Sequence, residues 1–305
     1  MAELVLFADA LVRATPLVVT ALAVALAFRG GVFNIGAEGQ LLLGATGATA
    51  VALWTAPALG HFSIVLSLLA AAAAGGLWAG IAAELRRRFH VLEIISTIML
   101  NFVALHLVSY LVRGPLQEPT RIYPQTKSIV EIARLPVILP GTRLHLGFIL
   151  GMVAALVLQW LFRRTAAGFR IRIVGVAPRA AWSAGKVNVP RTSFTVFVLS
   201  GALAGIAGGV EVTGVTFALY ENLSPGYGYT AIAVALIAGL RPLPIIASGV
   251  FIGILETGAL SVQRELAIPA SVASVAEAML ILAVLAGTRW RGREIFRAQR
   301  MEGGR

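Results

Sequence analysis

Long apolar runs separated by short polar breaks dominate the sequence up to about residue 288. Several of these runs extend for about 20 residues, the length that an α-helix needs to cross about 30 Å of hydrocarbon. A transmembrane β-barrel would instead require segments of about ten residues with alternating polarity. The pattern therefore predicts an all-α, polytopic membrane protein.

About nine transmembrane helices are expected, forming a single transmembrane domain over residues 1–288. Their approximate limits are 14–28, 41–57, 62–83, 92–112, 144–162, 192–212, 229–243, 245–262 and 270–288. The seventh and eighth are short and are joined by the sequence RPLP.

The distribution of Lys and Arg predicts the orientation. The chain has 25 basic and 14 acidic residues, a formal net charge of +11. The basic residues concentrate in the block Arg86–Arg88, in residues 163–191 and in the tail 289–305. Because basic loops are retained in the cytoplasm, we expect these segments and the C-terminus there, and the N-terminus outside. The charge thus reflects orientation in the membrane, and no nucleic-acid partner is expected.

Residues 113–143 form the longest segment expected on the extracytoplasmic side. The segment carries five basic residues against the orientation rule, but the number of spans before it places it outside. Its five prolines and its polar residues argue against a further span. We therefore expect an ordered extracytoplasmic cap.

Two glycine-rich polar elbows interrupt the apolar pattern. The first is RGGVFNIGAEGQLLLG at 29–44, and the second is YENLSPGYGYTAIAVALIAG at 220–239. Such chemistry is tolerated at membrane depth only where protein or water satisfies the backbone. The first elbow begins inside and the second outside, so the pair predicts an inverted internal repeat with a transport path near its interface. Alternatively, each elbow is a tight turn between two helices.

The polar side chains of the elbows and of the fourth span are candidates for the path. Thr97 and Asn101 are four residues apart and share one helix face, where they line the path or make an interhelical hydrogen bond. Tyr227 and Tyr229 flank Gly228, and their rings either stack on a flat base or form an interfacial belt. The predicted path residues are Asn34, Glu38, Gln40, Thr97, Asn101, Tyr227 and Tyr229.

Five ordered motifs resemble a known family. They are VFNIGAEGQLLLGA, STIMLNFVALHLVSYLVRGPLQEP, GTRLHLGF, SGALAGIAGGVEVTGV and LSPGYGYTAIAVAL. They resemble the permease subunits of ABC importers for nucleosides and simple sugars, which belong with the ribose and branched-chain amino acid permeases. The resemblance runs from about Ala14 to Gly287. Many nucleoside-type permeases carry one more helix before this region.

This resemblance implies an inner-membrane permease subunit that is not itself an enzyme. Two permease subunits, either two copies or a paralogous pair, form the pore within the membrane lipid. A cytoplasmic ATP-binding subunit drives alternating access, and an extracytoplasmic binding protein delivers the solute. ATP and Mg belong to the partner subunit, and no cofactor is expected on this chain, which lacks the GxxxxGK[ST] phosphate loop.

Residues 163–191 resemble the family's cytoplasmic coupling loop, which docks on the ATPase. Small residues would let a short helix seat closely against a partner, and an aromatic residue would anchor it. The predicted docking residues are Gly175, Ala177, Ala181, Trp182 and Gly185. The alternative is a basic loop that binds anionic lipid.

Other functions are weighed against this one. A secondary transporter driven by an ion gradient would use the buried Glu residues, and a branched-chain amino acid permease is a further alternative within the resemblance. An intramembrane enzyme would need convergent histidines and carboxylates, whereas three of the four histidines lie near span ends or in loops. The chain has no cysteine, so thiol catalysis and Cys-based metal sites are excluded, and no metal site is expected.

Overall fold

A computed structural model describes residues 2–183, 187–266, 275, 278–279 and 282–283. The N-terminal half contains α1 (Ala2–Arg29), α2 (Ala37–Leu59), α3 (Phe62–Phe89), α4 (Glu93–Arg113) and the 3-10 turn η1 (Glu131–Ala133). The remainder contains α5 (Gly147–Arg164), α6 (Ala166–Val176), α7 (Pro178–Ser183), α8 (Val189–Glu211), the π-helix η2 (Val212–Thr216), α9 (Tyr227–Ile237) and α10 (Pro242–Leu266).

Within the described residues, seven helices are long and apolar enough to cross a membrane. They are α1, α2, α3, α4, α5, α8 with η2, and α10. The prediction of a polytopic all-α membrane protein is therefore confirmed. The expected seventh span is the eleven-residue helix α9, which at 1.5 Å per residue is too short to cross the hydrocarbon. The expected ninth span, 270–288, and the tail, 289–305, lie largely or wholly outside the described residues.

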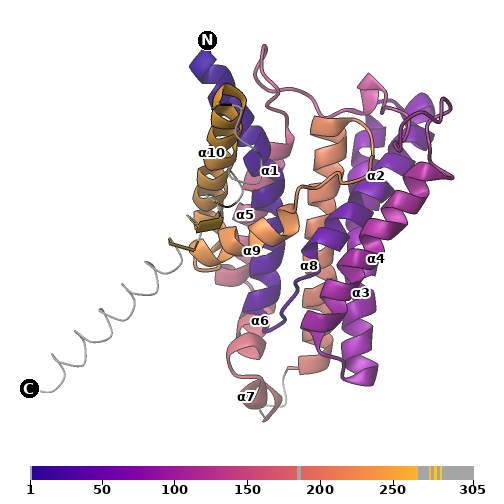
Figure 1. The fold of residues 1–305 in the computed structure, drawn as a ribbon. Helices are drawn as coiled ribbons and strands as arrows, with labels where there is room; N and C mark the ends of the chain where they lie inside the picture. Colours follow the sequence, from indigo (N-terminus) through magenta and orange to yellow (C-terminus); the bar gives the residue numbers. More distant parts are fainter. Residues whose placement is uncertain (1, 184–186, 267–274, 276–277, 280–281, 284–305) are drawn as a thin grey trace, which may run out of the picture.

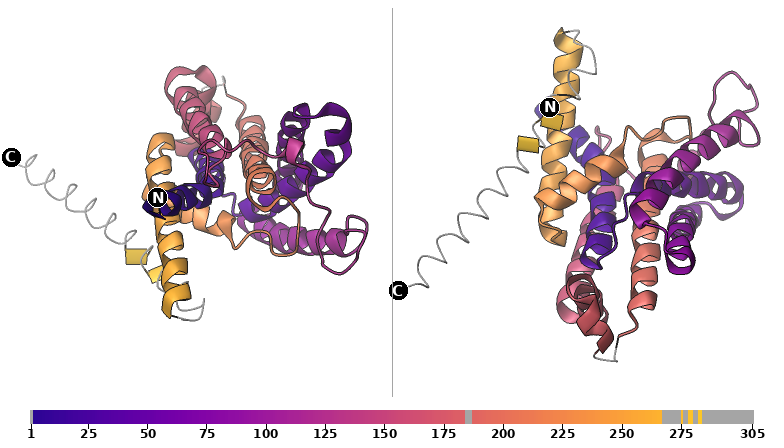
Figure 2. Two further views of the ribbon diagram at one scale, coloured as in Figure 1. Left: turned by 90° about the horizontal axis from the view of Figure 1, so that it is seen from above. Right: turned by 60° about the horizontal axis from the view of Figure 1, so that its bottom comes forward.

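The helices form two groups that meet along α8 (Figures 1 and 2). Helices α2, α3 and α4 lie on one side, and α1, α5 and α10 lie on the other. Helix α1 is the most buried of the candidate spans, with 83% of its apolar window inside the protein. In contrast, α3, α4 and α5 expose Leu77, Phe102 and Trp160, the side chains expected to face lipid.

Small residues allow α8 to pack closely against α3. A Cβ atom on Gly201 would lie 2.5 Å from the backbone oxygen of Gly75, and one on Gly205 would overlap the backbone oxygen of Ala71. The helix backbones are therefore in near contact, which is the usual role of small residues in membrane helices. This packing holds α8 close against α3.

The segment between α4 and α5 is an ordered cap without a further long helix. Its backbone follows the chain after α8: Thr126 N donates to Leu219 O at 2.8 Å, and Ile129 N donates to Phe217 O at 2.7 Å. Leu135 N likewise donates to Thr213 O at 2.9 Å. The cap therefore holds the second interrupted segment in place from one end of the bundle.

Candidate functional site

The two glycine-rich elbows meet inside the bundle. Residues 30–36 join α1 to α2, and residues 217–226 join η2 to α9. The two segments approach one another from opposite ends of the bundle (Figure 1). Where they meet, Gly228 N donates a hydrogen bond to Glu38 Oε2 at 2.6 Å. The first turns of α2 and α9 are thereby joined through one carboxylate.

Side chains satisfy the backbone at these two helix starts. The first N–H groups of a helix have no partner within it, and in hydrocarbon each unpaired group is costly. Asn101 Oδ1 accepts from Gly39 N at 2.9 Å, and Asn34 Oδ1 accepts from Gly36 N at 3.0 Å. At α9, Ser224 Oγ accepts from Tyr227 N at 3.0 Å. The polar residues of the elbows therefore make a buried helix start possible.

An amide pair ties the first elbow to α8. Asn34 Nδ2 donates to Gln40 Oε1, and Gln40 Nε2 donates to Asn34 Oδ1, both at 2.9 Å. Asn34 Nδ2 also donates to Ser200 Oγ at 3.0 Å, and Ser200 Oγ donates to Ala23 O at 2.8 Å. Residues from α1, the elbow, α2 and α8 thus share one network.

Asn101 joins α4 to both elbows. Its Nδ2 donates to Ile35 O at 3.0 Å in the first elbow and to Tyr229 Oη at 3.2 Å on α9. We call the connected residues Asn34, Glu38, Gln40, Asn101, Ser200, Gly228 and Tyr229 the polar joint. Thr97 is buried nearby but donates to Glu93 O at 2.6 Å within its own helix.

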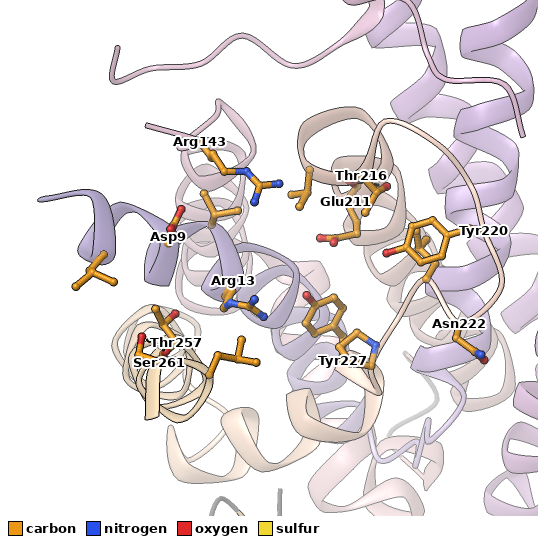
Figure 3. Close-up of a pocket in the computed structure, with 16 residues that line it drawn as sticks. Asp9, Arg13, Arg143, Glu211, Thr216, Tyr220, Asn222, Tyr227, Thr257 and Ser261 are labelled. Carbon is orange, nitrogen blue, oxygen red and sulfur yellow. Dashed lines mark hydrogen bonds between the residues drawn. The ribbon is translucent and has the colours of Figure 1, made fainter. Parts of the chain in front are cut away.

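The structure thus brings together the residues that sequence analysis assigned to the path. Five of the seven lie in the polar joint, and Thr97 is buried beside it. Tyr227 lines a cavity (Figure 3). Their role in transport remains a prediction. Each elbow joins consecutive helices, as the alternative of tight turns has it, and the two elbows also contact each other.

A cavity of about 690 Å³ lies next to the polar joint, toward the end of the bundle that carries the N-terminus and the cap. This volume is typical of small-molecule sites. Four charged residues line it: Asp9 and Arg13 from α1, Arg143 from the cap, and Glu211 from the end of α8. The uncharged polar lining includes Thr216, Tyr220, Asn222, Tyr227, Thr257 and Ser261.

Glu211 forms the inner wall of this cavity. Its side chain points toward the cavity, with Arg13, Arg143 and the two tyrosines around it (Figure 3), and the residue is only 4% exposed. Both guanidinium groups act on the carboxylate electrostatically, but no described residue donates a hydrogen bond to it. The π-helix Val212–Thr216 begins directly after it, and such distortions often occur at functional sites.

His145 supports the wall of the cavity from the cap. Its ring is 1% exposed and packs against Gly214, where an added Cβ atom would lie 2.5 Å from the ring. Its Nδ1 accepts from Gly147 N at 3.1 Å. Burial, with a smaller contribution from Arg143, lowers the pKa of His145 to about 4. The imidazole is therefore neutral at pH 7. Its ring packs between η2 and the cap.

Sequence analysis did not assign Asp9, Arg13, Arg143 or Glu211 to a site. The available signal was the charge itself, because an ionisable residue inside an apolar span indicates function by default. Glu211 has that property, whereas Arg13 lies just before the expected first span. Their convergence depends on the packing of α1 against α8, which the apolar pattern does not encode.

The predicted docking residues lie at the opposite end of the bundle, on α6 and α7. Trp182 is 66% exposed, Ala181 is buried, and Ala177 lies between the two helices. Gly175 packs within the chain itself: a Cβ atom on Gly31 would lie 2.9 Å from Gly175 Cα. The segment therefore touches the first elbow directly. Gly185 lies outside the described residues.

Interrupted helices that meet inside a bundle, beside a polar cavity, are typical of membrane transport proteins. Comparison with known families makes this assignment specific. Residues 6–285 match the family described as branched-chain amino acid transport system / permease component. The chain belongs to this family of ABC transporter permeases.

Several relatives are similar over most of their length. The chain is 38% identical to a glucose ABC transporter permease of Haloferax volcanii, covering 90% of this chain and 74% of the relative. It is 38% identical to a guanosine ABC transporter permease of Bacillus subtilis, covering 88% and 78%. A nucleoside ABC transporter permease of Lactococcus lactis is 30% identical, with coverage of 87% and 75%. No solved structure gives a significant match.

Proposed function

We propose that this chain forms the translocation path for nucleosides or related simple sugars in an ABC importer. The observation that carries the proposal is the cavity of about 690 Å³, lined by several hydroxyl groups and the Asn222 amide, beside the meeting point of two interrupted helices. Polyhydroxylated solutes match such a lining because each hydroxyl both donates and accepts. The names of the relatives agree with this class of solute.

The energy comes from a separate polypeptide. A cytoplasmic subunit that binds ATP and Mg docks on α6 and α7, with the exposed ring of Trp182 as its anchor. Its closure shifts the permease between two states, which requires ATP to bind one state more tightly than the other. A second permease copy or a paralogue completes the pore in the lipid bilayer.

The orientation follows from charge. Residues 163–191 and the C-terminus face the cytoplasm, and the cavity opens to the side where a binding protein delivers the solute. The direct contact of Gly175 with the first elbow gives the docking segment a mechanical connection to the polar joint. The position of the polar joint between the cavity and the docking segment supports its role as a gate.

Uptake by the complete complex in proteoliposomes tests this proposal. We expect uptake of labelled guanosine or glucose that requires ATP and the ATPase subunit and that persists with a protonophore. Uptake that survives loss of the ATPase and collapses with the protonophore would indicate a secondary transporter. Uptake of leucine alone would indicate an amino acid permease and would overturn the proposed solute class.

A further inference from the structure

The Glu211 carboxylate lacks hydrogen-bond donors in a buried position. The residue is 4% exposed, and no described residue donates to its oxygens. A buried carboxylate without donors is costly, because its oxygens together accept about four hydrogen bonds in water. The side chain points toward the cavity (Figure 3). Its oxygens therefore take their donors from the cavity, either from water or from a bound solute.

The charges of the lining select against an anionic ligand. Asp9 and Glu211 balance Arg13 and Arg143, so the formal charge of the four is zero. Glu256 on α10 acts electrostatically on Glu211 and Tyr227 as a further negative charge. A phosphate group entering this site would meet carboxylates as well as guanidinium groups. The site therefore disfavours an anionic solute.

Two tyrosines frame the carboxylate. The rings of Tyr220 and Tyr227 lie beside Glu211 in the cavity (Figure 3), and Tyr227 is 6% exposed. A flat base that stacks on an aromatic ring gains about 1–3 kcal/mol in nucleic-acid complexes. Tyr220 is the more exposed of the two rings, and a base stacked on it would lie beside Glu211. A sugar without a base would use only the hydroxyl groups of the lining.

The edge that suits a carboxylate carries adjacent donors. Guanine presents a ring N–H and an amino group side by side, and both donate. Adenine and cytosine present one donor beside an acceptor, and the acceptor would face the negative oxygens. Uracil presents one N–H between two carbonyl groups. We propose that Glu211 reads the base of the solute and makes this cavity selective for guanosine-type nucleosides; the inference rests on the proposed function and deepens it.

Equilibrium binding to the permease–ATPase complex in nanodiscs, without the binding protein, tests this inference. The probes are tritiated guanosine and adenosine. We expect guanosine to bind at least about tenfold more tightly than adenosine. With adenosine, a ring acceptor would face the Glu211 oxygens and leave these buried polar groups unpaired, which a binding site rejects strongly. In Glu211→Gln, the amide offers one donor and one acceptor. The Kd for guanosine should then rise about tenfold or more, while the Kd for adenosine stays within about threefold or falls.

Control variants distinguish a loss of base recognition from a general loss of folding or binding. Glu131→Gln changes an exposed carboxylate of the cap outside the cavity lining, and both Kd values should remain unchanged. Tyr220→Leu removes a ring but not the carboxylate, and both nucleosides should weaken together. If Glu211→Gln folds poorly, Glu211→Asp replaces it as the test variant. Asp keeps the negative charge on a shorter side chain, so the preference for guanosine over adenosine should fall.

The outcomes distinguish the two proposals. The proposal that Glu211 recognises the base is overturned if the ratio of the two Kd values is unchanged in both Glu211 variants. It is also overturned if both nucleosides lose affinity by the same factor. Failure of the wild-type complex to bind either nucleoside also overturns it, although nucleoside uptake by the full importer would still support the proposed function. If the full importer takes up neither nucleosides nor sugars, the proposed function itself fails.

Discussion

Glu38 and Gly228, which are 190 residues apart in sequence, are joined by a hydrogen bond of 2.6 Å from the Gly228 backbone N–H to the Glu38 carboxylate. Both residues lie in the first turn of a helix, α2 and α9 respectively. A negative charge is stabilised at a helix N-terminus, and here one carboxylate serves two of them. This contact is the point at which the two interrupted segments become one structural unit.

Removal of the Glu38 carboxylate should destabilise this unit. In Glu38→Ala, the Gly228 N–H loses its acceptor in a buried position, which costs about 1–3 kcal/mol. Glu38→Gln keeps an acceptor oxygen and should cost less. Thermal unfolding in detergent measures the difference, with Glu131→Ala as an exposed control. Equal unfolding temperatures for Glu38→Ala and the control would contradict the role of this carboxylate.

Gly228 should tolerate no side chain. A Cβ atom there would overlap the backbone of Glu38, so Gly228→Ala must push α9 away from α2. We expect loss of folded protein or of transport. Gly258→Ala on α10 is the matched control, because nothing lies within 4 Å of its added Cβ atom, and alanine favours a helix by about 1 kcal/mol over glycine. Similar behaviour of the two variants would show that the close approach is unimportant.

The sequence predicts much of this arrangement because the bilayer restricts the solutions. Long apolar runs must be helices, and glycine with Asn, Glu and Gln at membrane depth must lie where partners satisfy them. Asn34 and Glu38 could therefore be selected without coordinates. The length of α9 was overestimated, since an apolar run continues through the turn after Ile237. The charged cavity was missed because Asp9, Arg13 and Glu211 come from helices that meet only through tertiary packing.

Cysteine labelling should map the path directly, because the chain has no native cysteine. In the resting complex, we expect a membrane-impermeant thiol reagent to modify Thr257→Cys, which lines the cavity, but not the fully buried Asn34→Cys. If the polar joint is a gate, ATP turnover should expose Thr97→Cys to the same reagent. Labelling of Thr97→Cys that never depends on turnover would remove Thr97 from the predicted path.

The contact between Gly175 and the first elbow should be required for coupling. A Cβ atom on Gly175 would overlap the backbone oxygen of Arg29, so Gly175→Ala separates α6 from the elbow. We expect ATP hydrolysis to continue while uptake per ATP falls severalfold. Gly80→Ala is the control, since its nearest new contact would be an ordinary 3.8 Å to Val198. An unchanged ratio of uptake to hydrolysis in Gly175→Ala would show that the docking segment acts by another route.

Acidification should loosen the cap through His145. Its pKa is about 4 in the folded protein, against an ordinary value of 6.5. Between these values the unfolded chain binds a proton that the folded chain does not, so the free energy of unfolding falls as the pH drops from about 6.5 to about 4. The shift corresponds to a loss of up to about 3 kcal/mol in the free energy of unfolding.

The variant His145→Asn keeps a hydrogen-bond acceptor for Gly147 N but cannot titrate. Unfolding temperatures measured across this pH range should therefore decline less steeply in His145→Asn than in the wild type. Parallel declines would show that other titratable groups determine the acid sensitivity of the cap.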